Sequence, residues 1–137
     1  MKIRHILLTV ITATLLVLAL QSCSLFGTSK DARVDMFVDD LNYDRYNVYT
    51  NFHPDLCGDY DSLKDPTYEL NVDFPTAYND YNVYDRDESG DTVTATIEGY
   101  GGAGFGPQPI TFYMAKDGLF DWKIERLDSP SGVVLYQ

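Results

Sequence analysis

The stretch ITFYMAKDGLFDWKI, residues 110–124, alternates apolar and polar side chains on both sides of a turn. Every second residue on each side is large and apolar: Ile110, Phe112 and Met114, then Phe120, Trp122 and Ile124. This alternation predicts two strands, each with one buried face. Between them, Lys116-Asp117-Gly118 predicts a hairpin turn in which Gly118 supplies the positive φ. The rest of the fold is predicted outward from this antiparallel hairpin.

The same period of two continues on both sides of the hairpin. Residues 92–97 (TVTATI) predict a strand whose inward face is Val93, Ala95 and Ile97. Upstream, Tyr81 and Val83 lead into a turn at residues 87–90. Downstream, residues 129–132 (SPSG) predict a turn, and residues 133–136 an edge strand. These segments together predict an antiparallel sheet.

The N-terminal part of the chain has helical spacing instead. One apolar stripe follows i, i+3, i+4 and i+7: Val34, Phe37, Val38 and Leu41. A second stripe predicts a shorter helix that ends at His53-Pro54: Tyr46, Tyr49 and Phe52. Residues 67–74 fit either a short helix or an extended segment. Helices followed by strands predict an α+β fold, with two or three helices packed on one face of a curved antiparallel sheet.

One hydrophobic core is expected between these helices and the sheet. Its predicted members come from both parts of the chain: Phe37, Leu41, Phe52, Val93, Ile97, Phe112, Met114, Trp122 and Ile124. All the inward strand positions are apolar. We therefore expect either a filled core or an unspecific apolar pocket, and neither resembles a tuned acid–base site.

Two segments resemble nuclear transport factor 2-like domains. Residues 37–55 (FVDDLNYDRYNVYTNFHPD) are similar to the opening helices of that family, and residues 114–124 to its closing hairpin, in which a Trp-Lys-Ile strand is common. The resemblance covers residues 31–127 and implies a cone, in which a bent antiparallel sheet wraps around two or three helices. The family includes isomerases, dehydratases and polyketide cyclases as well as non-enzymatic binding and dimerising domains. The fold alone therefore does not determine the function.

The first 22 residues have the pattern of a secretory signal. Lys2, Arg4 and His5 are basic, and residues 6–20 carry no charge. A membrane-spanning helix needs about 20 apolar residues, so this run is short for a span. An uncleaved anchor helix is the alternative, but it would not need a cysteine at the end of the run.

Leu20-Gln21-Ser22-Cys23 resembles the lipobox of bacterial lipoproteins. The resemblance implies cleavage before Cys23, a diacylglyceryl group on its thiol and an N-acyl chain, which together anchor stably. Ser24 after the cysteine resembles the pattern for export to the outer membrane in diderm bacteria. The predicted organisation is a signal peptide over 1–22, a lipidated tether over 23–30 and a single α+β domain over 31–137.

The composition limits the classes of partner. The chain has 10 Lys and Arg against 21 Asp and Glu, a net charge of −11. Cleavage would remove Lys2 and Arg4 and no acid, which leaves −13. This charge argues against nucleic acid and against electrostatic attachment to anionic lipid. The expected partners are the membrane, through Cys23, and a protein partner or a second copy of the chain; no cofactor is predicted.

The candidates for catalysis are few. His53 would be the only histidine after cleavage. It is a weak candidate for a general base, alone or as a dyad with Asp55, and a role at the helix end is favoured. With Cys23 lipidated, Cys57 has no intramolecular disulfide partner. We expect it to be a small buried residue rather than a nucleophile paired with His53.

Two motifs resemble ligand-binding sequences only in part. Residues 85–90 (DRDESG) imitate half of a calcium loop, but Thr96 replaces the twelfth-position Glu, so an acidic hairpin turn and no metal site is predicted. Residues 99–104 contain G-x-G-x-x-G, but Pro107 and Pro109 exclude the helix that a dinucleotide site requires. A flexible connection is the favoured interpretation. The functional alternative is a loop that presents Tyr100 and Phe105 to a ligand or partner.

The sequence therefore predicts a lipid-anchored envelope protein with a binding or assembly role rather than an enzyme. The alternative is a small-molecule isomerase, lyase or hydrolase that uses the pocket of the cone. A purely structural envelope component is a third possibility.

Overall fold

The computed structural model describes residues 27–65, 70, 73–76, 80–100, 106–129 and 134–135. The signal segment, Cys23 and Phe105 lie outside the described residues. The described elements are helices α2 (Lys30–Tyr43), η1 (Arg45–Asn51) and η2 (Ser62–Lys64), and strands β1 (Asp80–Ser89), β2 (Thr92–Tyr100), β3 (Gln108–Asp117), β4 (Asp121–Asp128) and β5 (Val134–Leu135). Both η elements are 3-10 helices. None of the described helices is long and apolar enough to cross a membrane.

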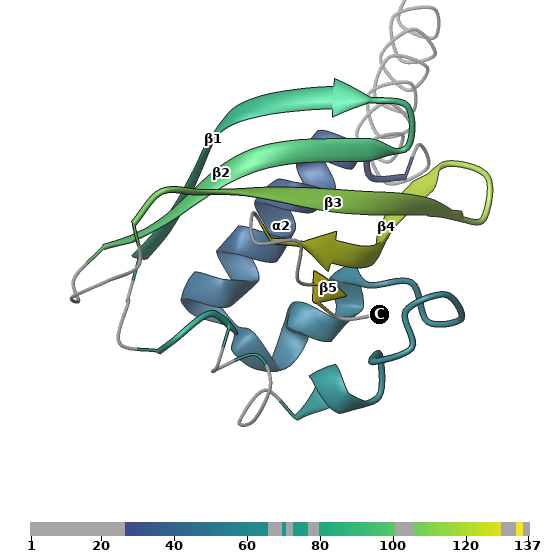
Figure 1. Ribbon diagram of the computed structural model, residues 1–137. Helices are drawn as coiled ribbons and strands as arrows, with labels where there is room; N and C mark the ends of the chain where they lie inside the picture. Colours follow the sequence, from purple (N-terminus) through teal and green to yellow (C-terminus); the bar gives the residue numbers. More distant parts are fainter. Residues whose placement is uncertain are drawn as a thin grey trace, which may run out of the picture.

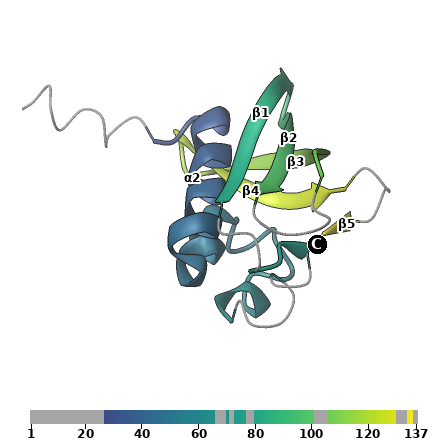
Figure 2. The ribbon, with the colours of Figure 1, turned by 90° about the vertical axis from the view of Figure 1, so that its left-hand side faces the viewer.

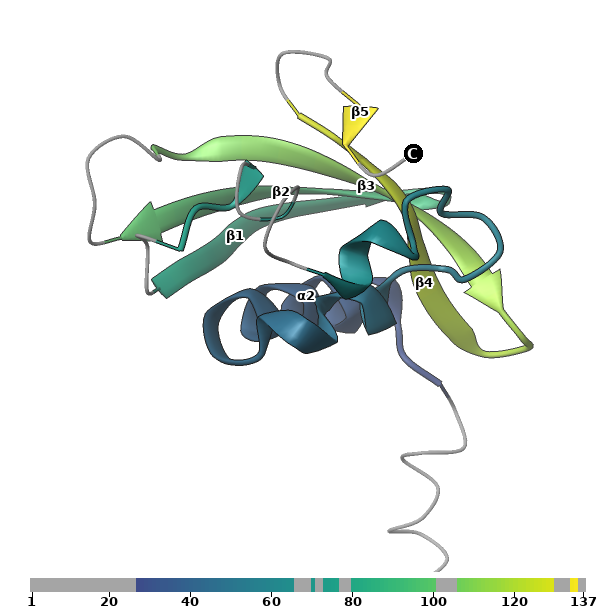
Figure 3. The same ribbon diagram turned by 90° about the horizontal axis from the view of Figure 1, so that it is seen from below.

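The strands form one antiparallel sheet in the order β1-β2-β3-β4-β5. β1 and β5 are its outer strands, so the described sheet is open. α2 and η1 lie together on one face of it (Figures 1 and 3), and the edge-on view shows two layers (Figure 2). The predicted α+β fold, with helices on one face of an antiparallel sheet, is confirmed. The edge strand predicted over residues 133–136 is also confirmed, as β5.

The core between the two layers is filled with side chains. The predicted stripe of α2 is buried, and Phe37 is its centre. Its ring makes edge-to-face contacts with Phe52, Phe74 and Phe112, at centroid distances of 5.5 to 5.9 Å. Such pairs stabilise by about 0.5–1.5 kcal/mol beyond their buried area. Phe74 also donates its backbone N–H to the carbonyl of Leu70, 2.8 Å away, as in a helical turn.

The second predicted apolar stripe faces the core only in part: Phe52 is buried and Tyr49 packs against the core, but Tyr46 does not. η1 is a 3-10 helix with three residues per turn, and its buried residues are Val48 and Asn51. Tyr46 is 68 % exposed. Phe52 has left the helix and pairs with Ile124 of β4. The helix does end before Pro54, as predicted.

The β3–β4 hairpin is confirmed, and Gly118 has a φ of 82°. Two of its predicted inward residues are not in the core. Phe120 belongs to the turn and is 57 % exposed, because β4 begins only at Asp121. Trp122 is half-buried at the margin of the core. The remaining predicted core residues are all buried.

A bulge in β4 changes which residues face the core. Met114 pairs with Ile124, whereas the preceding Tyr113 pairs with Arg126, so Glu125 is an extra residue on β4. An extra residue shifts the alternation by one position. As a result Leu127, rather than Arg126, is fully buried beyond Ile124.

Residues 27–29, which lie in the segment expected to be tether, contact the β3–β4 hairpin and α2. Thr28 donates its N–H to Asp121 Oδ1 at 3.0 Å and accepts the N–H of Trp122 at 3.0 Å. Ser29 then caps α2, accepting the Ala32 N–H at 3.2 Å. Gly27 has a φ of 66°, and a Cβ there would lie 2.3 Å from the carbonyl oxygen of Phe120. Only glycine can therefore occupy position 27 at this close contact with the backbone of Phe120.

Candidate functional site

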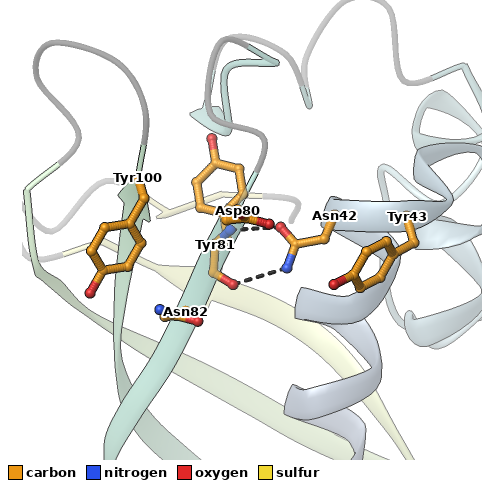
Figure 4. A pocket seen from close by; sticks show the side chains of 6 residues that line it. All are labelled: Asn42, Tyr43, Asp80, Tyr81, Asn82 and Tyr100. Atoms are coloured by element: carbon orange, nitrogen blue, oxygen red, sulfur yellow. Dashed lines mark hydrogen bonds between the residues drawn. The ribbon is translucent and has the colours of Figure 1, made fainter.

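An open cleft of about 260 Å³ lies between the C-terminal end of α2 and the adjoining ends of β1 and β2 (Figure 4). Its lining is polar and aromatic: Asn42, Tyr43, Asp80, Tyr81, Asn82 and Tyr100. Figure 4 shows Tyr43 and Tyr100 on opposite sides of the cleft, with the other side chains between them.

Asn42 fixes the geometry between helix and sheet. Its Nδ2 donates to the carbonyl of Tyr81 at 2.9 Å, and its Oδ1 accepts the Tyr81 N–H at 2.6 Å. The side-chain amide thus pairs with backbone groups that an edge strand otherwise leaves unpaired. The Tyr81 ring is buried, and its hydroxyl donates to the carbonyl of Pro75 at 2.8 Å. Tyr81 is therefore held at its backbone by Asn42 and at its hydroxyl by Pro75.

The walls of the cleft are exposed. Tyr43 is 81 % exposed and Tyr100 is 46 % exposed. The Tyr100 hydroxyl donates to Glu98 Oε2 at 2.8 Å, and Tyr84 donates to the same oxygen at 3.3 Å. Burial and the Glu98 carboxylate raise the pKa of Tyr84. Glu98 therefore orients the Tyr100 ring.

The cleft offers aromatic faces together with amide and carboxylate groups. Asp80 and Asn82 are exposed on β1. Such a combination can stack on a ligand and form hydrogen bonds with its hydroxyl or amide groups. Of the two loop residues predicted from the sequence, Tyr100 lies in this cleft and Phe105 lies outside the described residues. Asn42, Tyr43, Asp80 and Asn82 were missed, because exposed and half-exposed residues carry no periodic signal; Tyr81 was predicted only as a strand residue.

His53 lies at the opposite end of the sheet from the cleft. Its Nε2 is 3.2 Å from the carbonyl of Lys116, and its Nδ1 accepts the N–H of Asp55 at 3.2 Å. Since Nδ1 accepts a hydrogen bond, the ring proton is on Nε2 and is donated to Lys116. The imidazole is 7 % exposed, and the backbone of Asp55, not its carboxylate, contacts it. This arrangement leaves neither ring nitrogen available to a substrate.

Cys57 is buried, as predicted. Burial raises the pKa of its thiol to about 11. The thiol is therefore neutral at physiological pH, and it lacks the thiolate character that nucleophilic cysteines need.

Two residues of the 85–90 segment, Arg86 and Glu88, form ion pairs with α2. The segment belongs to β1 and its turn, where Gly90 has a φ of 58°. Arg86 pairs with Asp35, and Glu88 accepts Lys30 Nζ at 2.6 Å. In the part of the chain that the structure describes, no three His, Cys, Asp or Glu side chains are grouped to hold a metal ion.

A buried polar cluster around Arg33 was also missed from the sequence. Arg33 is 3 % exposed. Its Nε donates to the carbonyl of Trp122 at 2.7 Å, its Nη1 to Asn51 Oδ1 at 3.2 Å and its Nη2 to Asp121 Oδ1 at 2.8 Å. Asn51 in turn donates to Asp40 Oδ2 at 2.7 Å. One guanidinium therefore ties α2 to η1 and β4, which is a structural role.

No protein-family model, curated protein or solved structure matches this chain.

Proposed function

We propose that this chain is a lipid-anchored protein of the bacterial cell envelope, held by Cys23, that binds a ligand in the cleft between α2 and β1–β2. The observation that carries this proposal is the contrast between two places in the fold. The cleft is open, and Tyr, Asn and Asp side chains line it. His53, by contrast, is buried with both ring nitrogens hydrogen-bonded. The contrast favours binding over acid–base catalysis.

The chemistry of the cleft favours a neutral ligand rich in hydroxyl groups, such as a glycan. Tyr43 and Tyr100 offer apolar ring faces at the two sides, and Asp80 and Asn82 offer acceptors and donors between them. A net charge of −11 disfavours an anionic ligand. The outer membrane of a diderm cell is the location that we propose, because Ser24 follows Cys23.

We also infer that the fold is an open form of the nuclear transport factor 2-like cone. The order of the described elements supports this inference, because the helices α2, η1 and η2 precede an antiparallel sheet whose β3–β4 hairpin carries Trp122. The inward faces of the strands are packed against α2, so the proposed ligand site is at the rim rather than inside the cone.

Calorimetric titration of the purified protein with N-acetylglucosamine oligosaccharides tests the binding role. Heat of binding is expected for the wild type, with at least a tenfold loss of affinity in Tyr100→Ala. Tyr46→Ala is the matched control, since Tyr46 is an exposed tyrosine outside the cleft. If Tyr100→Ala instead leaves the heats unchanged and dissociates a dimer in sedimentation velocity, the cleft serves assembly between copies of the chain.

The anchor is tested separately. Cys23→Ser should release the protein from membranes or leave it unprocessed, and wild-type protein should incorporate a fatty-acid analogue. Wild-type protein without incorporated lipid would overturn the lipoprotein assignment.

A further inference from the structure

The turn of the β3–β4 hairpin presents two large apolar side chains to the outside. Leu119 is 78 % exposed and Phe120 is 57 % exposed. Lysines flank them: Lys116 Nζ is 3.5 Å from the carbonyl of Leu119, and both Lys116 and Lys30 lie over the ring of Trp122. An apolar tip bordered by lysine and tryptophan side chains is typical of segments at a membrane–water interface.

The chain enters the fold beside this same turn. Gly27 is in such close approach to the backbone of Phe120 that no Cβ fits between them. Thr28 is hydrogen-bonded to Asp121 and Trp122. Figure 3 shows the segment before α2 entering next to the start of β4. Residues 27–29 and the turn of the β3–β4 hairpin therefore lie on the same side of the domain.

The distance to the anchor is short. Cys23 precedes Gly27 by four residues. Four residues span at most about 14 Å when fully extended. If lipid chains hold Cys23 at the bilayer surface, Phe120 is within reach of the interfacial region of the same leaflet.

From these three observations we infer that Leu119 and Phe120 insert into the interface of the membrane that holds Cys23, and that this second contact orients the domain. The inference rests on the proposed lipid anchor. The contact is apolar, so it does not depend on electrostatic attraction, which the acidic chain disfavours.

The orientation has a consequence for the cleft. α2 begins at Lys30, whose ammonium lies over the Trp122 ring beside the hairpin turn, and it ends at Tyr43, which lines the cleft. It has 14 residues, which corresponds to about 20 Å at 1.5 Å per residue. The strand pairing agrees, because Ile97↔Gln108 marks the cleft end of the sheet and Lys116↔Trp122 the turn end. The cleft is thereby directed away from the membrane.

Depth-dependent quenching tests this contact on the lipidated full-length protein, reconstituted in vesicles of phosphatidylethanolamine and phosphatidylglycerol. One variant carries a thiol-linked nitrobenzoxadiazole probe at Leu119→Cys. The matched control carries it at Tyr43→Cys, which is 81 % exposed at the other end of α2. Cys57 should not be labelled in the folded protein, because it is buried and its pKa is raised.

Brominated lipid should quench the probe at position 119 several-fold more than the probe at position 43, and aqueous iodide should do the reverse. Adding Phe120→Asp to the Leu119→Cys variant should abolish the lipid quenching while the protein still floats with the vesicles. Equal quenching at the two positions would overturn the inference, as would unchanged lipid quenching in the Phe120→Asp variant, since the probe alone would then be inserting. Wild-type protein that fails to float would contradict the lipid anchor itself, which separates the two failures.

Discussion

The side-chain amide of Asn42 pairs with both backbone polar groups of Tyr81, at 2.9 and 2.6 Å. The last full turn of α2 is thus joined to the first strand of the sheet by the kind of pairing that normally joins two strands. Tyr81 is buried and Asn42 lies in the cleft wall, so one contact serves both the core and the candidate site. Stability and cleft geometry are coupled at this point.

Asn42→Ala should lower the free energy of unfolding by about 1–3 kcal/mol, because it leaves two backbone groups of Tyr81 without their partners. Urea melts would measure the change. Asn42→Asp is the informative comparison, because its protonated carboxyl can still accept the Tyr81 N–H and donate to the Tyr81 carbonyl, whereas the ionised carboxylate places an oxygen against that carbonyl. Its loss of stability should therefore grow as the pH rises through the carboxyl pKa, and a loss independent of pH would contradict the contribution of the Nδ2 donor.

His53→Ala should destabilise the protein by about 1–3 kcal/mol, more than the 1 kcal/mol or less expected for a histidine at a helix end. The reason is that the Asp55 N–H and the Lys116 carbonyl both lose a hydrogen-bond partner. Ligand binding in the cleft should be unaffected, because His53 is at the other end of the sheet. Lost function in a fully stable His53→Ala protein would restore the catalytic hypothesis.

The Arg33 cluster should make stability depend on acidity through Asp121. Burial would raise the pKa of this carboxyl, but the Thr28 N–H and Arg33 outweigh burial and lower it from its ordinary value of 3.8. The ionised carboxylate therefore stabilises the fold above pH 3.8, and this contribution is lost as the pH falls through the lowered pKa.

Asp121→Asn should consequently be less stable than the wild type at neutral pH, and the difference should shrink below about pH 4. Denaturant melts of both chains across pH 2 to 7 would measure it. Burial raises the pKa of Asp40, which shifts stability in the opposite sense, but Asp40 is present in both chains. A difference that is constant with pH would show that the Asp121 charge contributes nothing.

The turn position of Phe120 and the bulge at Glu125 predict unequal costs of truncating Phe120 and Leu127. Leu127→Ala should cost about 2–5 kcal/mol, because Leu127 is fully buried. Phe120→Ala should cost about 0.5 kcal/mol or less, because Phe120 is exposed in the turn. Urea melts that reverse this order would restore the regular alternation read from the sequence.

The same comparison shows why the sequence predicted some elements and missed others. β2 and β3 alternate regularly up to Met114, so their inward residues could be read from the period of two. The bulge at Glu125 lies beyond the last inward residue read from the sequence, Ile124, so the burial of Leu127 could not be predicted by continuing the alternation.

The candidate cleft was harder to predict because its parts are distant in the chain. Asn42 and Asp80 are polar, exposed or half-exposed, and separated by the whole segment between α2 and β1. Only the fold brings them together. Tyr100 was found for a different reason, since it adjoins the Gly-rich stretch.

Gly27→Ala should detach the N-terminal segment from β4 without unfolding the domain. A methyl group at this position would lie 2.3 Å from the carbonyl oxygen of Phe120, and the backbone would have to move. The Trp122 N–H, which Thr28 accepts, should then exchange with solvent faster. Hydrogen exchange at the Trp122 amide measures this directly.

Gly90→Ala is the matched control, because Gly90 also has a positive φ, of 58°, but a Cβ there has no atom within 4 Å. The two variants share the strain of a left-handed alanine and differ only in the steric clash. Faster exchange at Trp122 in Gly27→Ala alone would show that the close approach to Phe120 holds the N-terminal segment against the hairpin. Equal exchange in the two variants would mean that the contacts of residues 27–29 with β4 do not depend on the close approach of Gly27 to Phe120. The short path from Cys23 to the hairpin turn would then lose its support.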